Sequence, residues 1–305
     1  MVVLVTGASG AIGTALIPAL TGSGRVVRAL GRDPARITAA GLDAVVTGDL
    51  STGAGLDEAF SGVDVAYYLV HAMETADGHF ADREREQAER FAAACARAGV
   101  RRIVYLGGLV PPSGPQSAHL ASRLAVEEVL LAAAPEAVAL RASIVISPTS
   151  RSFRFLVRLV ERSPLLPLPA WRSNRTQPID GRDVIEHLLA AGSSPAVTGP
   201  LSLDIAGPDC VTYASLVARI SDALLLSRPG IALPFALNTV AGPIAAAIAG
   251  EDPALVGPLM ESLSTDLLPR DDAADRLFGV EPRSLGAAIA WALRAWESTE
   301  ELAAR

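Results

Sequence analysis

The sequence predicts an α/β fold: a doubly wound, mainly parallel sheet with a smaller, mostly helical lobe at the carboxyl end. Short, continuously apolar runs alternate with helical segments through the first half of the chain, as in parallel sheets that are covered on both faces. A glycine-rich turn joins the first apolar run to the first helical segment. After about residue 150 the pattern changes to helical pieces with proline-rich connections. We therefore expect one domain over residues 1–150 and a second lobe over residues 151–305, interleaved with the carboxyl edge of the sheet.

The individual elements follow from the apolar runs and the turn residues between them. In the first half, strands are expected over residues 2–6, 26–30, 44–49, 64–70, 103–107 and 137–143. Helices are expected between these strands, over residues 10–20, 80–98 and 120–134. In the second half, helices are expected over residues 152–162, 183–191, 213–226 and 284–297. Strands that alternate with helices in this way predict a parallel sheet.

The composition indicates a protein with a large core and excludes several classes of function. Half of the 305 residues are hydrophobic and 19% are charged, which is unlike a disordered chain. A net charge of −7 argues against a basic face for nucleic acid. Cys95 and Cys210 are too few for a disulfide framework, and neither they nor the four scattered histidines have metal-ligand spacing. All 26 basic residues are arginine, so any mechanism that requires lysine is excluded.

Neither a secretion signal nor a membrane span is expected. The amino-terminal MVVLVTGASG has no basic segment before its apolar run and leads directly into the glycine turn. The longest uncharged stretch, residues 229–250, contains three prolines and Asn238 and is rich in alanine. A span needs about 20 strongly apolar residues, so a buried helix pair or a lid over a pocket is the better interpretation. We expect a cytoplasmic protein with a small-molecule substrate, and the sequence leaves a homodimer open.

The turn VTGASGAIG has the composition of a phosphate-binding loop. It places Gly7, Gly10 and Gly13 directly after the first strand and into the first helix. Such glycines permit a tight bend, a close approach of backbone N–H groups to pyrophosphate, and close packing of helix on strand. The positive end of the helix dipole then faces the anion. In this strand–turn–helix context the glycines predict a dinucleotide-binding site.

With its G-x-x-G-x-x-G spacing, TGASGAIG resembles the extended and atypical short-chain dehydrogenase/reductase families, which have the Rossmann fold. The resemblance continues through VVRALGRDPARI, VTGDL, VAYYLVHAM and LRASIVISP. The later segments RTQPIDGRDVIEHL and LFGVEPRSLGAAI are similar to those of atypical, NmrA-like bacterial members. The resemblance covers essentially the whole chain and implies NAD(P)H as cofactor. The residues that it implies as cofactor contacts are Gly7, Ala8, Ser9, Gly10, Ala11, Ile12, Gly13, Asp49, Leu50, Leu69, Val70, His71, Gly107, Ser143 and Ile144.

The end of the second strand, ALGRDP, bears on the choice between NADP(H) and NAD(H). An NAD-binding protein normally has a carboxylate here that binds the ribose 2′-OH. In this chain Arg32 comes first, and a guanidinium suits a 2′-phosphate. We therefore expect Arg32 to bind the cofactor and favour NADP(H), while NAD(H) stays open because Asp33 follows. The alternative is that Arg32 is a surface residue before a helical turn.

The residues that would catalyse the family's reaction are replaced in this chain. In the family, a tyrosine hydroxyl protonates the substrate carbonyl, a lysine four residues later lowers the pKa of that tyrosine, and a serine positions the substrate. Gly107 and Gly108 stand where the serine is expected, and His119 and Arg123 have the tyrosine–lysine spacing. An imidazolium is a competent acid, whereas a neighbouring guanidinium would lower its pKa. His119 and Arg123 are therefore candidate catalytic residues, or they only line the cofactor pocket.

The candidate substrate-binding residues are Gly108, which follows the fifth strand, and the pair Trp171 and Arg175 in PLPAWRSNRTQPI. With Arg172, this segment offers an aromatic plane and guanidinium groups, which suit a flat or anionic ligand. Packing of Trp171 inside the lobe is an equally good interpretation.

Three functions are compatible with these features. The first is an NADP(H)-dependent reductase of an apolar, conjugated acceptor such as a quinone or enone, which tolerates weak proton donation. The second is a non-catalytic NADP(H)-binding redox sensor or regulatory protein, because a fold does not imply an activity. The third is a tailoring enzyme that performs a non-redox reaction in the same cleft. The missing catalytic set favours the second and third, while the apolar second lobe favours the first and third.

Overall fold

The structure, a computed structural model, describes residues 1–71, 80–115, 117–168, 170–232, 263–300 and 302. In this part of the chain a seven-stranded parallel sheet has the order β11-β6-β5-β4-β1-β2-β3. Because the order reverses between β1 and β4, this is a doubly wound sheet, and the predicted fold class is confirmed. The strands are β1 (Val2–Thr6), β2 (Val26–Gly31), β3 (Ala44–Thr47), β4 (Val65–Tyr68), β5 (Arg102–Gly108), β6 (Glu136–Ala142) and β11 (Leu201–Ile205).

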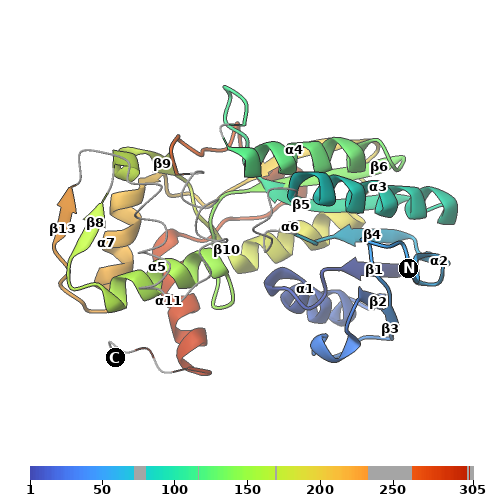
Figure 1. Cartoon of the computed structure of the whole chain (residues 1–305), viewed down its shortest axis with the longest axis horizontal. Coiled ribbons are helices and arrows are strands. Elements are labelled where there is room, and N and C mark those ends of the chain that lie inside the picture. Colours follow the sequence, from blue (N-terminus) through green and yellow to red (C-terminus); the bar gives the residue numbers. More distant parts are fainter. Residues whose placement is uncertain (72–79, 116, 169, 233–262, 301, 303–305) are drawn as a thin grey trace.

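Helices cover both faces of this sheet (Figure 1). Side chains of β1 alternate between the two faces, as the pleat of a strand requires: Val3 and Val5 enter one core, and Leu4 enters the other. The first core lies under α1 (Ala11–Gly22) and α6 (Gly181–Ser193). The second lies under α2 (Leu56–Phe60), α3 (Phe80–Ala98) and α4 (Ala118–Leu131).

The carboxyl-terminal part of the chain builds a separate third core beside the sheet, on the left in Figure 1. Phe153, Leu216 and Trp296 meet in this core, and they come from α5 (Arg151–Arg162), α7 (Tyr213–Ala223) and α11 (Leu285–Glu297). The smaller elements are α10 (Ala273–Phe278), the 3-10 turns Pro34–Arg36 and Ala170–Ser173, β7 (Val145–Ile146), β8 (Leu166–Leu168), β9 (Arg175–Thr176), β10 (Ile179–Asp180), β12 (Val211–Thr212) and β13 (Gly230–Ala232).

β11 is a strand that the sequence analysis did not expect. Its residues LSLDI pair in parallel with β6, with Leu203 opposite Leu140. The run is short, mixes polar with apolar residues and lies at the edge of the sheet, so it lacks the continuous apolar signal of an inner strand. The expected strands 44–49 and 64–70 end earlier than expected, at Thr47 and Tyr68. The first ends there because Asp49 starts a turn in which its carboxylate accepts a hydrogen bond from the Ser51 N–H.

The expected helix over residues 120–134 is shifted toward the amino terminus. The Ser117 hydroxyl caps the helix by accepting a hydrogen bond from the Leu120 N–H at 3.2 Å, so α4 begins at Ala118. Most of the uncharged stretch 229–250 lies outside the described residues. Among the helices that the structure does describe, none has the length and hydropathy of a membrane span.

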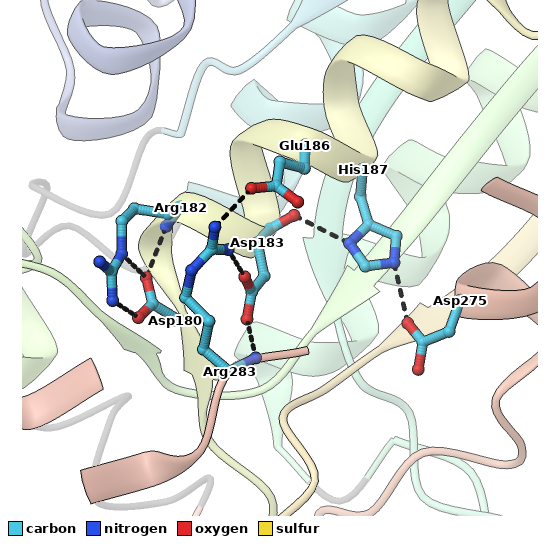
Figure 2. A network of polar contacts seen from close by, with 7 residues as sticks. All are labelled: Asp180, Arg182, Asp183, Glu186, His187, Asp275 and Arg283. Atoms are coloured by element: carbon cyan, nitrogen blue, oxygen red, sulfur yellow. Dashed lines mark hydrogen bonds and ion pairs between the residues drawn. The ribbon is translucent and has the colours of Figure 1, made fainter. Parts of the chain in front are cut away.

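The two segments that resemble NmrA-like proteins contact each other (Figure 2). The Arg283 backbone N–H donates to Asp183 at 2.7 Å, and its guanidinium contacts Asp183 and donates to Glu186 at 2.8 Å. His187 lies between the Asp183 carbonyl at 2.8 Å and the Asp275 carboxylate at 2.9 Å. Asp183 and His187 are completely buried. These residues therefore attach the carboxyl-terminal segment to α6, and their role is to hold the fold together.

Candidate functional site

The glycine turn between β1 and α1 can hold only glycine at two of its positions. Gly7 has a φ of +70°, and a Cβ on it would lie 2.5 Å from the Leu69 carbonyl oxygen after β4. A Cβ on Gly13 would lie 2.4 Å from the Gly7 carbonyl oxygen. The backbone of the turn therefore packs directly against the strand-end segment after β4, at the point where the strand order reverses.

The amino end of α1 has the properties of an anion site. Gly10 is the N-cap residue, and no side chain caps the helix, so the first-turn N–H groups are available to a ligand. Ser9 and Gly10 are exposed, Ala11 and Ile12 are half-buried, and Ala8 is buried against the core. A pyrophosphate fits this turn, because the backbone donors are there and the glycines leave room for it.

Arg32 and Asp33 lie at the carboxyl end of β2, and the structure separates their roles. The Asp33 carboxylate accepts a hydrogen bond from the Ala35 N–H at 3.0 Å and so caps the short 3-10 turn Pro34–Arg36. Arg32 is exposed, and its guanidinium makes no hydrogen bond or ion pair with any other described residue. An adenosine ribose would lie at this strand end. Of the two side chains there, the Arg32 guanidinium is the one that has no partner among the described residues.

The remaining residues expected on the adenosine side line the ends of β3 and β4. Leu50 is buried, and Asp49 is half-buried with its carboxylate engaged by the Ser51 N–H and hydroxyl. Leu69 is buried under the glycine turn, and Val70 is half-buried. His71 is exposed, and its Nδ1 contacts the guanidinium of Arg123.

Arg123 belongs to a buried polar cluster that joins α3, α4 and the segment after β4. Its side chain is 7% exposed and lies 3.8 Å from the carboxylate of Glu84, which also accepts a hydrogen bond from the Ser122 hydroxyl at 2.6 Å. The Nε of Arg123 has no hydrogen-bond partner among the described residues. Burial lowers the pKa of Arg123 to about 10, so it remains cationic at neutral pH. The cluster places one incompletely bonded cation beside His71.

His119 lies one helical turn before Arg123 on α4 and is half-buried. Its pKa is lowered, which is the expected direction, but the cause is burial of the ring and not the charge of Arg123. A histidine with a lowered pKa is neutral at pH 7, so it is a poor proton donor there. Tyr68 and Tyr105 cannot replace it, because burial raises the pKa of both phenols and their side chains lie inside the core.

Gly107 and Gly108 end β5 and are half-buried. A Cβ on Gly107 would lie 2.8 Å from the ring of Tyr105, so a serine could stand there only if that ring moved. A Cβ on Gly108 would make an ordinary contact with Leu120 at 3.6 Å. In this fold, a serine at position 107 would therefore require the Tyr105 ring to take another position.

Ser143 and Ile144 follow β6 and connect the sheet to the third core. The Ser143 hydroxyl shares a hydrogen bond of 2.8 Å with the hydroxyl of Thr176, which is fully buried. Ile144 lines an apolar cavity together with Trp171. Arg175 is exposed and is paired with Asp266, whose carboxylate accepts from the Arg175 backbone N–H at 2.7 Å and from its Nε at 2.9 Å. Within the described residues, no cluster of side chains could hold a metal ion.

Comparisons with known proteins show the family of this chain. A family model described as NAD(P)H-binding matches residues 7–145, which begin at the first glycine of the turn and contain β2 to β6. Ceramide reductase of Caulobacter vibrioides is 30% identical over 218 residues, which are 71% of this chain and 68% of that protein. The chain belongs to the atypical short-chain dehydrogenase/reductase family. The family recognised from the glycine turn is thus confirmed.

Two further likenesses concern a part of the chain and its fold. A (4-alkanoyl-5-oxo-2,5-dihydrofuran-3-yl)methyl phosphate reductase of Streptomyces griseus is 39% identical over 105 residues, which are 34% of this chain and 33% of that protein. A UDP-glucuronic acid 4-epimerase from Bacillus cereus, solved with UDP-glucuronic acid and NAD, has a TM-score of 0.74 at 17% identity. The superposition covers 98% of this chain and 100% of that chain, and at this identity it shows the fold.

Sequence reasoning missed Glu84 and Ser122, which support Arg123 from within the core. Glu84 stands in the charged run DREREQAER, which suggests a solvent-exposed helix face. A signal was nevertheless present, because Glu84 precedes Ala88, Phe91 and Cys95 at helical spacing, and all of these are buried. A carboxylate on the apolar face of a helix indicates a buried partner.

Proposed function

We propose that this protein is an NADP(H)-dependent reductase of an apolar, conjugated small molecule of the quinone or enone type. One observation carries the proposal: the site keeps the complete turn for a pyrophosphate, but none of its described side chains is a strong proton donor at neutral pH. A reductase with this site needs an acceptor whose reduction does not depend on a well-placed acid. Conjugated carbonyl compounds meet this requirement, since conjugation spreads the negative charge that hydride transfer creates.

The preference for NADP(H) over NAD(H) rests on Arg32. Its guanidinium is exposed beside the end of β2, while the Asp33 carboxylate is used to cap the next turn. A guanidinium can form paired, charge-assisted hydrogen bonds with a 2′-phosphate, and a carboxylate already bound to a backbone N–H is less able to receive a ribose hydroxyl. Arg123 is the candidate to hold the second ribose, because its Nε is unpaired and it lies beside the strand-end segment at His71.

NADPH, held by the glycine turn and Arg32, would supply the hydride for the electron-poor carbon of the conjugated acceptor, and a proton would complete the reduction. Gly107 and Gly108 end β5, and the segment Ser143–Ile144 follows β6, so both would border the reacting groups if the ligands bind at the carboxyl ends of the strands. Since His119 is neutral at pH 7, water delivers the proton at neutral pH, and His119 contributes as an acid only at lower pH. The missing tyrosine and lysine are then no obstacle to the reaction.

The names of two curated relatives support a reductase. One is a ceramide reductase, and the name of the other describes an alkanoyl group on an unsaturated 5-oxo-dihydrofuran ring, which is a conjugated carbonyl system. Both names describe substrates with an apolar part. They support the reaction class and leave the substrate of this chain to experiment.

A second candidate function is a non-catalytic NADP(H) sensor. It is favoured by the incomplete hydrogen bonding of Arg123. Its contacts with His71 and Glu84 can report whether a nucleotide is bound, even if no substrate is ever reduced. The same experiment separates the two functions. Purified protein is titrated with NADPH and with NADH by calorimetry, and oxidation is then followed at the nicotinamide absorbance band with a panel of quinones and enones.

We expect NADPH to bind at least tenfold more tightly than NADH and to be oxidised by some members of the panel. Tight NADPH binding without oxidation by any acceptor would favour the sensor. If neither nucleotide bound, both functions would be rejected, and a non-redox reaction in the cleft would become the leading candidate.

A further inference from the structure

A cavity of about 80 Å³ lies between the carboxyl-terminal helices and the end of the sheet. Its wall is formed by α5, α7, the 3-10 turn Ala170–Ser173 and the segment after β6. The rings of Trp171 and Tyr213 meet edge to face, with their centroids 6.0 Å apart, and form a stiff side of the cavity. Native interiors contain few voids larger than a water molecule, so a cavity of this size needs an explanation.

The lining of the cavity favours an apolar, hydrocarbon occupant. Of the described residues that line the cavity none carries a charge, and most are aliphatic or aromatic: Ile144, Phe155, Leu156, Leu216, Val217 and Leu267. Tyr213 stays neutral at working pH, because burial raises the pKa of its phenol to about 12. The polar atoms of the lining side chains are the Ser152 hydroxyl, the Trp171 Nε1 and the Tyr213 hydroxyl, and the other described lining side chains offer a water molecule no hydrogen-bond partner.

The volume limits the size of the occupant. A dry apolar cavity of about 150 Å³ is known to hold a benzene molecule, and this cavity has roughly half that volume. It therefore suits a segment of about three or four carbon atoms. A charged group would have to leave its water without an opposite charge among the described lining residues to compensate it.

The segment at which the acceptor would react also lines the cavity. Ile144 lines it and stands two residues beyond the end of β6. The bond of 2.8 Å between the hydroxyls of Ser143 and Thr176 fixes this segment against the second lobe. A substrate whose reacting carbon lies at the strand ends could thus extend a chain past Ile144 toward Leu216 and Val217 on α7.

We propose that this cavity binds the hydrocarbon end of the acceptor, an alkyl segment of about three or four carbons, and that Val217 and Leu216 set its length. This inference rests on the proposed reductase function, because the location of the reacting carbon comes from it. It goes further by naming the substrate class: conjugated carbonyl compounds that carry a short alkyl arm or end in one.

The test measures binding without turnover. Protein loaded with NADPH is titrated by calorimetry with straight-chain alcohols from ethanol to hexanol. Each added methylene should tighten binding about fourfold until the cavity is full, after which the affinity should level off. Val217→Phe fills the cavity and should make the series flat, whereas the control Ala218→Phe adds the same ring at an exposed position of α7 and should leave it unchanged. Val217→Ala enlarges the cavity and should extend the series by about one carbon, which keeps the test decisive if Val217→Phe does not fold.

The same variants are then assayed with enones of increasing alkyl length. For acceptors that fill the cavity, Val217→Phe should raise KM by about 60-fold, the product of three methylene steps, and leave kcat and NADPH affinity unchanged. A flat alcohol series in the native protein, or a series that Val217→Phe does not alter, would overturn the inference. Oxidation of NADPH with a KM independent of chain length would overturn it while the reductase function stands. A chain-length series without any oxidation would reject the reductase function and keep the cavity as a ligand site.

Discussion

Two arginines are buried at opposite ends of the strands of the central sheet, and they are bonded very differently. Arg102 begins β5, is 2% exposed, and donates to the Glu136 carboxylate at 2.8 Å and to the carbonyls of Ala191 at 3.0 Å and Val197 at 3.2 Å. Arg123, on the side where the strands end, is 6% exposed, lies 3.8 Å from Glu84 and leaves its Nε unpaired. The first arrangement is complete without a ligand, and the second is not.

The hydrogen-bond partners of a buried cation indicate its role in this fold. A buried charge is costly unless it is paired and hydrogen-bonded, so a complete set of partners indicates a structural role. An incomplete set at the carboxyl ends of the strands, where ligands bind in doubly wound sheets, indicates that a ligand supplies the missing partner. Four sets of substitutions test these roles.

The largest effect is expected from Glu136→Gln, which removes the charge partner of Arg102. Leaving a buried guanidinium without its carboxylate should cost about 3 kcal/mol in the free energy of unfolding, the lower end of the usual range because Glu136 is 20% exposed. NADPH affinity should not change. Urea denaturation and calorimetry measure the two quantities, and Glu128→Gln on α4 serves as the control.

The same pair predicts an acid effect. Burial alone would raise the pKa of Glu136, but hydrogen bonds and charge from Arg102 and Arg101 hold it below its usual value. A carboxylate with a lowered pKa stabilises the fold above the pKa that it has in the unfolded chain, and this contribution is lost as the pH falls through the folded pKa. The native protein should therefore lose stability below about pH 4.5 more steeply than Glu136→Gln does. Parallel curves of stability against pH for the two proteins would show that the ion pair of Arg102 with Glu136 does not stabilise the fold.

The second change, Arg32→Ser, concerns an arginine that is exposed and unpaired among the described residues. Loss of paired charge-assisted bonds to a 2′-phosphate should weaken NADPH binding by about 30-fold and leave NADH binding unchanged. Arg36→Ser is the matched control, since Arg36 is another exposed arginine of the same segment. Equal effects of the two substitutions would mean that Arg32 is only a surface residue.

The doubly wound sheet could be predicted from the sequence because its inner strands are continuous apolar runs and its glycine turn has few other uses. The edge strand β11 could not, because the pairing of Leu203 with Leu140 depends on contacts distant in sequence. In the site, Gly7 and Gly13 were found because backbone geometry restricts them to glycine. Glu84 was not found, because its burial depends on how α3 packs on α4, and the charges around it resemble a solvated face.

The third change tests Arg123 in a background that leaves no unpaired carboxylate. Glu84→Gln alone should have little effect on cofactor binding, and adding Arg123→Met should weaken NADPH binding about tenfold, as loss of a charged hydrogen bond does. The melting temperature of the double variant should stay close to that of Glu84→Gln, because Met is of similar length and the cation was incompletely bonded. A large loss of stability with unchanged NADPH affinity would show that Arg123, like Arg102, has a structural role.

The smallest effect at neutral pH is expected from His119→Phe. Burial lowers the pKa of His119 below its usual value of 6.5, so at pH 8 the ring is neutral in both the folded enzyme and solution and cannot donate a proton. The value of kcat/KM for an enone should therefore differ by less than about twofold between the native protein and the variant at pH 8. As the pH falls below about 6.5, the imidazolium fraction rises and the native protein should gain a rate contribution that the variant lacks. A rate that is lost in the variant already at pH 8 would show that His119 acts with its proton in place, and the acceptor would then not need to be conjugated.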